Sequence, residues 1–196
     1  MTGKLVEFGK PALVAVVIVL CLQASGWWGG VSFVGQSALM KTGMLDALSS
    51  DLSREAPNFD FNFTIKDLEG NKLSFTRFKG KVIFLNLWAT WCGPCRAEMP
   101  TIQALYNDIG KDSIVFVMLS LDKDSAKEKI VKYIKNSAYT FPVYQPSGYL
   151  TQQLGVPSIP TTFVVSKEGK IVAKEVGTTN FNTAKFKRFM IDQASK

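Results

Sequence analysis

The sequence predicts an α/β fold in which a central mixed sheet is flanked by helices. Two apolar, β-prone runs, 82–88 and 114–121, alternate with segments of helical pattern, which is typical of helices packed on both faces of a sheet. A hairpin pattern precedes these runs, and two strands joined by a glycine turn follow them. The sheet is therefore expected to combine parallel and antiparallel strands.

The first predicted element is a β-hairpin. Phe59, Phe61 and Phe63 alternate with polar residues, as in a strand with one buried face. Residues 67–71 have the composition of a turn, and the chain returns through 73–75. We therefore expect an amino-terminal hairpin in front of the rest of the sheet.

The remaining elements follow in chain order. The run 82–88 is almost continuously apolar, which is typical of a central strand buried on both faces. It leads directly into a helix. A later strand is entered through a proline, and Gly169 turns it into an antiparallel partner. The predicted ranges are a strand at 82–88, a helix reaching about 107, a strand at 114–121, a helix at 125–136, strands at 159–165 and 171–176, and a helix at 183–194.

The residue counts exclude several classes of function. The chain has 196 residues, 23 Lys and Arg against 16 Asp and Glu, three Cys and no His. Without histidine it offers no Ser-His-Asp or Cys-His catalysis and no His-ligated metal site. The lysines are scattered along the chain and form no stripe, so we expect an ordinary solvated surface and no nucleic-acid partner.

An uncharged amino-terminal segment predicts a membrane anchor. Residues 11–31 supply the roughly 20 apolar residues that span a bilayer, and two tryptophans near their end suit an interfacial belt. Lys4 and Lys10 favour a cytoplasmic location for residues 1–10. A transmembrane signal anchor is therefore the favoured interpretation.

Two other interpretations of this segment stay open. One is a signal peptide that is cut near Ala24, and the other is a lipoprotein that is acylated at Cys21. Under each of the three, residues 32–56 form a linker, and residues 57–196 form a single domain outside the cytoplasm, expected to be a monomer.

Cys92 and Cys95 form a CxxC pair at the start of the helix that follows the buried strand. Unpaired N–H groups and the positive end of a helix stabilise a thiolate at the first cysteine, which lowers its pKa. The spacing lets the second sulfur reach the first and resolve a mixed disulfide, and Pro94 fits a first turn, where its missing N–H has no partner. The alternatives are a zinc half-site, two buried core thiols and a fixed structural disulfide, but the chain has too few further ligands for zinc.

Several motifs resemble one family. The pentapeptide 91–95 (WCGPC) after a strand resembles the thioredoxin active site, and 156–161 (VPSIPT) resembles the loop that carries that family's cis-proline. The hairpin, 86–92 (NLWATWC) and 96–100 (RAEMP) are similar to the membrane-anchored TlpA/ResA-like thiol-disulfide oxidoreductases of bacteria. This resemblance covers about residues 57–195 and implies a thioredoxin-like fold with an added amino-terminal β-hairpin.

The resemblance also implies a role for individual residues. Cys92 attacks the substrate disulfide, and Cys95 resolves the mixed disulfide. Pro160, in its cis form, presents the backbone of Ile159 to an extended substrate and keeps metals off the thiols. The two residues between the cysteines complete the active-site turn; they are Gly93 and Pro94.

Asn86 stands where thioredoxins carry a buried aspartate, so the proton path is expected to differ from theirs. Glu98 is the candidate substitute, because it lies three residues after Cys95 and helical spacing places it beneath the dithiol. Burial there would raise its pKa and suit it to proton transfer, whereas the alternative is an exposed helix carboxylate. Trp91 is expected to supply an apolar platform beside Cys92, with an ordinary surface aromatic as the alternative.

The implied function is that of an extracytoplasmic thiol-disulfide oxidoreductase, anchored in the bacterial inner membrane and working as a reductase. Electrons arrive from a membrane thiol donor and leave to a disulfide of an envelope protein, with cytochrome c maturation as the specific candidate. No cofactor and no metal are expected. A dithiol oxidase or isomerase is the first alternative. A copper-delivery protein on the same fold is disfavoured, because such carriers generally need a histidine beside the cysteine pair.

Overall fold

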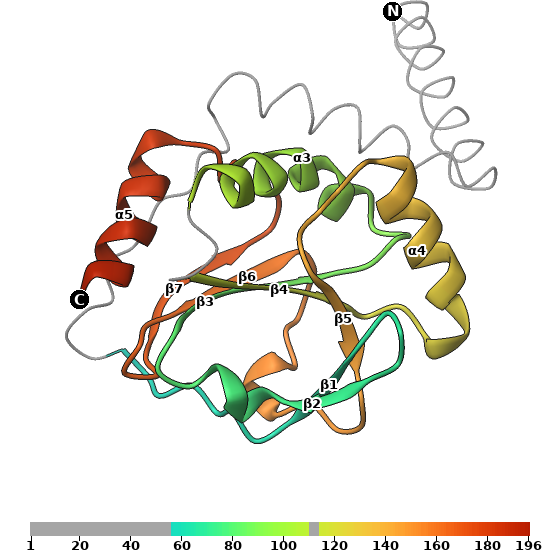
Figure 1. Cartoon of the computed structure of the whole chain (residues 1–196), viewed down its shortest axis with the longest axis horizontal. Coiled ribbons are helices and arrows are strands. Elements are labelled where there is room, and N and C mark those ends of the chain that lie inside the picture. Colours follow the sequence, from blue (N-terminus) through green and yellow to red (C-terminus); the bar gives the residue numbers. More distant parts are fainter. Residues whose placement is uncertain (1–55, 110–113) are drawn as a thin grey trace, which may run out of the picture.

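The computed structural model describes residues 56–109 and 114–196. Seven strands and three α-helices alternate along them, with three short 3-10 helices between (Figure 1). In chain order they are β1 (Thr64–Asp67), β2 (Lys72–Ser74), η1 (Phe75–Phe78), β3 (Val82–Trp88), α3 (Gly93–Asp108), β4 (Ile114–Ser120), η2 (Asp124–Ala126), α4 (Lys127–Asn136), β5 (Val143–Pro146), η3 (Gln152–Leu154), β6 (Thr161–Val165), β7 (Ile171–Val176) and α5 (Ala184–Ser195).

The strands form one mixed sheet in the order β2-β1-β5-β4-β3-β6-β7. The β3–β4 and β4–β5 pairs are parallel, and the other pairs are antiparallel. All seven residues of β3 are buried, and each pairs with β4. This confirms the prediction of a mixed sheet around a central strand that is buried on both faces.

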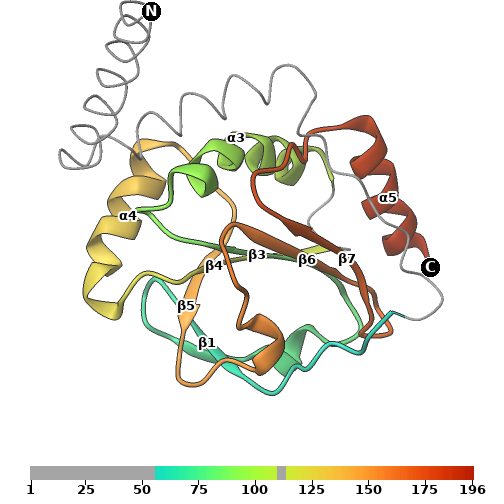
Figure 2. The ribbon, with the colours of Figure 1, turned by 180° about the vertical axis from the view of Figure 1, so that it is seen from behind.

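The two faces of the sheet are covered differently (Figures 1 and 2). The steps from β3 through α3 to β4 and from β4 through α4 to β5 run in the same direction across the sheet. Right-handed crossovers therefore place both helices on the same face. That face packs Phe84, Trp88 and Phe116 against residues of α3, α4 and α5. All three α-helices therefore lie on one face, contrary to the expectation that helices would cover both. The opposite face is covered by the 3-10 helices η1 and η3 and the segment before β1.

The amino-terminal hairpin forms, but its first strand begins later than predicted. Phe59, Phe61 and Phe63 are buried in alternation with exposed neighbours, as their pattern indicates. Their backbone belongs to no named strand, and only an isolated bridge joins Asn58 to Lys170. The hydrogen-bonded ladder with β2 starts at β1. The three rings pack with Phe75 from η1. This burial holds the segment in place together with two backbone bonds, from Phe59 N–H to the carbonyl of Gly169 and from Phe75 N–H to the carbonyl of Phe63.

The predicted amino terminus, anchor and linker lie outside the described residues, except for residue 56. Within 56–109 and 114–196, no helix is both long and apolar enough to cross a membrane.

Candidate active site

The dithiol lies where β3 ends and α3 begins. Cys92 is the N-cap of α3, in an extended conformation (φ −84°, ψ 106°), and Gly93 and Pro94 are the first residues of the helix. The backbone N–H of Cys95 donates to Cys92 Sγ at 3.1 Å. The two cysteines form a disulfide with their Cα atoms 5.3 Å apart. The structure therefore shows the oxidised form of the CxxC pair.

The two sulfurs differ in exposure. Cys92 is 5% exposed and Cys95 is 0% exposed. Only the first can meet a substrate before any rearrangement, and it lies beside the positive end of the helix, which favours a thiolate. The geometry fits Cys92 as the attacking cysteine and Cys95 as the resolving one.

The predicted cis-proline faces the dithiol. The Ile159–Pro160 peptide bond is cis, and Cys92 Sγ lies 3.7 Å from the carbonyl oxygen of Ile159. The backbone N–H of Gly177 donates to the carbonyl of Pro160 at 2.9 Å. The hydroxyl of Thr161 donates to the carbonyl of Ser158 at 2.8 Å. These bonds anchor both flanks of the loop beside the sulfur.

A buried polar network extends from the same helix. Glu98 is 0% exposed, which excludes the exposed helix carboxylate. Its Oε1 accepts from Asn86 Nδ2 at 2.7 Å, and its Oε2 accepts from the backbone N–H of Thr179 at 3.3 Å. The same Asn86 nitrogen donates to Thr162 Oγ1 at 2.9 Å, while the buried Asn86 Oδ1 has no hydrogen-bond partner. The Glu98 carboxyl group thus bonds to β3 and to the loop before α5, and Asn86 links it to β6.

Burial raises the pKa of Glu98 to about 8, although the hydrogen bonds from Asn86 and Thr179 act in the opposite direction. Burial takes the carboxyl group out of bulk solvent, so the ionised form loses solvation that two donors replace only in part. A carboxyl group with a pKa near neutrality can both accept and release a proton at physiological pH. Glu98 lies three residues after Cys95 on α3 and has the properties that a proton acceptor for this thiol needs.

An open groove lies between Trp91, which precedes the dithiol in the chain, and Ile159, whose carbonyl oxygen faces Cys92. It has a volume of about 520 Å³ and no charged side chain among its lining residues. The indole of Trp91 is 64% exposed. The lining residues are Trp91, Leu121, Leu154, Gly155, Val156, Pro157, Ser158 and Ile159. An extended segment in this groove would meet apolar side chains and the backbone of Ile159.

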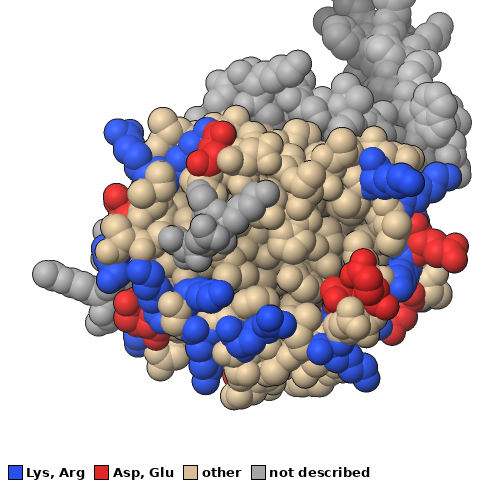
Figure 3. All heavy atoms as spheres, in the orientation of Figure 1, with Lys and Arg blue, Asp and Glu red and all other residues tan. Residues whose placement is uncertain are grey.

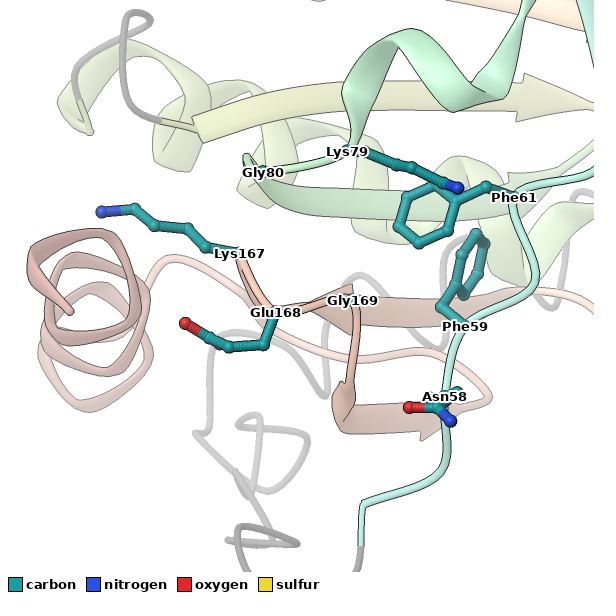
Figure 4. A pocket seen from close by; sticks show the side chains of 8 residues that line it. All are labelled: Asn58, Phe59, Phe61, Lys79, Gly80, Lys167, Glu168 and Gly169. Atoms are coloured by element: carbon teal, nitrogen blue, oxygen red, sulfur yellow. The ribbon is translucent and has the colours of Figure 1, made fainter.

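A second hollow, of about 350 Å³, lies at the opposite end of β3 (Figure 4). Lys79 and Gly80 border it just before β3 begins, whereas the dithiol follows the end of that strand. Phe59 and Phe61 stand together on one side, and the ammonium of Lys79 lies 5.6 Å from the centre of the Phe61 ring. Lys and Arg side chains also gather at the lower left of Figure 3, where the β6–β7 turn lies in Figure 1. This hollow contains no cysteine and takes no part in the dithiol site.

The structure brings the predicted site residues together, from Trp91 to Glu98 on one side and Ile159 with Pro160 on the other. Sequence reasoning missed Thr162 and Thr179, whose contacts with the network depend on tertiary structure. No group of three or more His, Cys, Asp or Glu side chains is placed to hold a metal ion within the described part of the chain.

The comparisons with known proteins agree with this geometry. Residues 53–187 match the Redoxin family model. A protein named thiol-disulfide oxidoreductase ResA, from a strain of Bacillus cereus, is 33% identical over 167 residues, which cover 84% of this chain and 86% of that one. The sporulation thiol-disulfide oxidoreductase A of Bacillus subtilis is 32% identical over 117 residues, covering 59% of this chain and 70% of the relative.

Solved structures show the same fold. The crystal structure of StoA from Bacillus subtilis matches with a TM-score of 0.53 and 28% identity, over 65% of this chain and 94% of that one. A thiol-disulfide oxidoreductase from Bacteroides vulgatus, described as putative, matches with a TM-score of 0.58 and 26% identity, over 71% and 99% of the two chains. Together with the oxidised Cys92–Cys95 pair, these similarities identify the activity as protein-disulfide oxidoreduction. The chain belongs to the Redoxin family, as a TlpA/ResA-like thiol-disulfide oxidoreductase of the thioredoxin superfamily.

Proposed function

We propose that the protein works outside the cytoplasm as a disulfide reductase for envelope proteins, held at the bacterial inner membrane by residues 11–31. The observation that carries the reductase direction is the site itself: a Gly-Pro pair separates the cysteines at a helix start, beside a groove with no charged side chain among its lining residues. A Gly-Pro pair resembles that of reducing thioredoxins, whose reduction potential is about −270 mV, whereas that of the strong oxidant DsbA is about −120 mV.

The reaction begins with the reduced enzyme. The Cys92 thiolate attacks one sulfur of the substrate disulfide, forms a mixed disulfide, and the other substrate sulfur leaves as a thiolate. Cys95 then loses its proton, for which the Glu98 carboxylate is the proposed acceptor, and attacks Cys92 Sγ. The second substrate sulfur leaves, so the substrate gains two electrons and the enzyme ends as the disulfide seen here. A membrane thiol donor is the proposed source of the electrons that restore the dithiol.

Two active-site variants of the full chain test this order of steps, with insulin as the disulfide substrate and dithiothreitol as reductant. Cys95→Ala is expected to stop turnover. When this variant is first reduced and then mixed with insulin after the dithiothreitol has been removed, it is expected to accumulate one mixed disulfide per chain, because no second thiol is present to release it. Cys92→Ala is expected to stop turnover without forming such an adduct. Adduct formation by the Cys92 variant, or normal turnover by either, contradicts the proposed roles.

Cytochrome c maturation is the specific pathway that we propose for this reductase. An oxidised peptide with a C-x-x-C-H sequence is the direct probe, since apocytochrome c presents its haem-attaching cysteines in that form. The reduced enzyme is expected to transfer its electrons to this peptide. If the peptide disulfide stays intact while insulin is reduced, the cytochrome proposal fails and the general reductase proposal stands.

A further inference from the structure

A buried carboxylate at the end of β4 holds the turn that carries the dithiol. Asp122 Oδ2 accepts from the backbone N–H of Thr90 at 2.7 Å, and Asp122 Oδ1 accepts from the Thr90 hydroxyl at 2.7 Å. Asp122 is 6% exposed and Thr90 is 5% exposed. A single residue therefore occupies both oxygens of one carboxylate, two positions before Cys92. None of the motifs used to predict the active site includes Asp122.

Further donors complete the surroundings of this carboxylate. The Ser120 hydroxyl donates to Asp122 Oδ2 at 2.8 Å, and Gln145 Nε2 donates to the Asp122 backbone carbonyl at 3.3 Å. Ser120 and Gln145 are both buried. An ionised carboxylate has only acceptor sites, which the three donors on its oxygens match. Bonds to a buried charged group are stronger than those between neutral groups and costly to break.

The pair connects the two sides of the groove. Trp91 follows Thr90 in the chain, Leu121 precedes Asp122, and both Trp91 and Leu121 line the groove. The backbone N–H of Leu121 also donates to the carbonyl of Trp88 at 2.8 Å, so the end of β4 is joined to the end of β3. The position of Trp91 relative to Leu121 therefore depends on the bonds between their sequence neighbours.

We propose that Thr90 and Asp122 form a positioning clamp, which sets the spacing of Trp91 and Leu121 and thereby the affinity for protein disulfides. The proposal deepens the reductase function proposed above and rests on it. The hydrogen bonds of Thr90 and Asp122 given above include neither of the reacting sulfurs. The clamp acts on binding of the segment beside the substrate cysteine, whereas the bond exchange itself belongs to Cys92 and Cys95.

The test compares Thr90→Val with Thr90→Ser in the full chain, using reduction of insulin by dithiothreitol. Valine has the shape of threonine but lacks the hydroxyl, whereas serine keeps both bonds to Asp122. Loss of a hydrogen bond to a buried charge is expected to raise the KM for insulin about tenfold, with kcat within about twofold of the unchanged protein. Thr90→Ser is expected to keep its KM within about twofold. Ser166→Ala is the matched control, because it removes a buried hydroxyl that accepts from Lys170 N at the remote β6–β7 turn.

The outcomes separate the clamp from a general loss of stability. The clamp is supported if KM rises in Thr90→Val and stays normal in the serine and Ser166 variants. It is overturned if the valine variant keeps a normal KM, or if all three variants change alike. Should Thr90→Val fail to fold, Asp122→Asn tests the clamp instead. The amide nitrogen of asparagine would face one of the two hydrogen-bond donors of Thr90, so this variant is expected to raise the KM for insulin similarly. An unchanged protein that does not reduce insulin removes the reductase proposal and the clamp with it, whereas a failure confined to the variants removes the clamp alone.

Discussion

Replacing Glu98 with glutamine is predicted to remove a defined part of the pH dependence of folding. The carboxyl group is completely buried, and its pKa rises from 4.5 to about 8 in the folded protein. Between these values the unfolded chain has released the proton while the folded chain still holds it. Folding stability therefore falls as pH rises through this range and is greatest below the unfolded pKa.

The magnitude follows from the two pKa values. Each pH unit in the range lowers the free energy of unfolding by about 1.4 kcal/mol, so the whole range from 4.5 to about 8 corresponds to roughly 5 kcal/mol. Between about pH 5 and pH 7 the expected loss is about 2–3 kcal/mol. Glutamine does not titrate, and its amide loses one of the two bonds from Asn86 and Thr179. Glu98→Gln should therefore show a constant loss of stability without this slope.

Urea denaturation of the oxidised full chain at both pH values measures the effect. The informative quantity is the difference in unfolding free energy between the unchanged protein and Glu98→Gln, because the other titrating groups cancel in it. We expect this difference to move by about 2–3 kcal/mol in favour of the glutamine variant as pH rises. Asn86→Leu removes a hydrogen bond that lowers the pKa of Glu98, so it should extend the slope to higher pH. A difference that stays constant between the two pH values would refute the reasoning about burial.

Two further predictions concern the groove and the remote turn. Trp91→Ala should raise the KM for insulin by about five- to tenfold with little loss of folding stability, because the exposed indole lines the groove. Steady-state kinetics measure the KM and urea denaturation measures the stability. An unchanged KM would count against the groove as the binding site. Gly169→Ala should destabilise the fold by about 1–2 kcal/mol more than Gly80→Ala. Both glycines have φ near +78° (+77° and +79°), but only at Gly169 does the added Cβ approach the Phe61 ring, at 3.2 Å. Equal losses in urea denaturation would show that this contact is harmless.

The strands with strong local patterns could be predicted from sequence, and the weak ones could not. The apolar run of β3 indicates burial on both faces, because each of its apolar residues packs against one layer or the other. Strand β5 has four residues, ends in a proline and pairs with β4 at two positions only, so its identity depends on neighbours far away in the chain. The predicted start of the hairpin is too early, because the alternation of phenylalanines with polar residues indicates which side chains are buried and does not indicate where the backbone hydrogen bonds between the strands begin.

Part of the active site could likewise be predicted from the sequence, and part could not. The positions of Cys92, Cys95 and Glu98 relative to one another follow from the spacing of one helix, which sequence displays directly. The partners of Glu98 come from β3 and the loop before α5, and β6 contributes Thr162 as a second partner of Asn86, so the network requires the assembled sheet. Asp122 belongs to no recognisable sequence motif, because its proposed role depends on hydrogen bonds from Thr90, which is 32 residues away in the chain.

The reduction potential of the Cys92–Cys95 pair tests the central claim most directly. The full chain is equilibrated in dithiothreitol or glutathione buffers of graded potential, and the fraction of free thiols is scored by alkylation. A reductase is expected to give a value near or below about −250 mV, close to that of thioredoxin. A value between about −180 and −120 mV would identify an oxidase or isomerase and contradict the reductase assignment. Failure of the two cysteines to form a disulfide at any potential would contradict the redox function altogether.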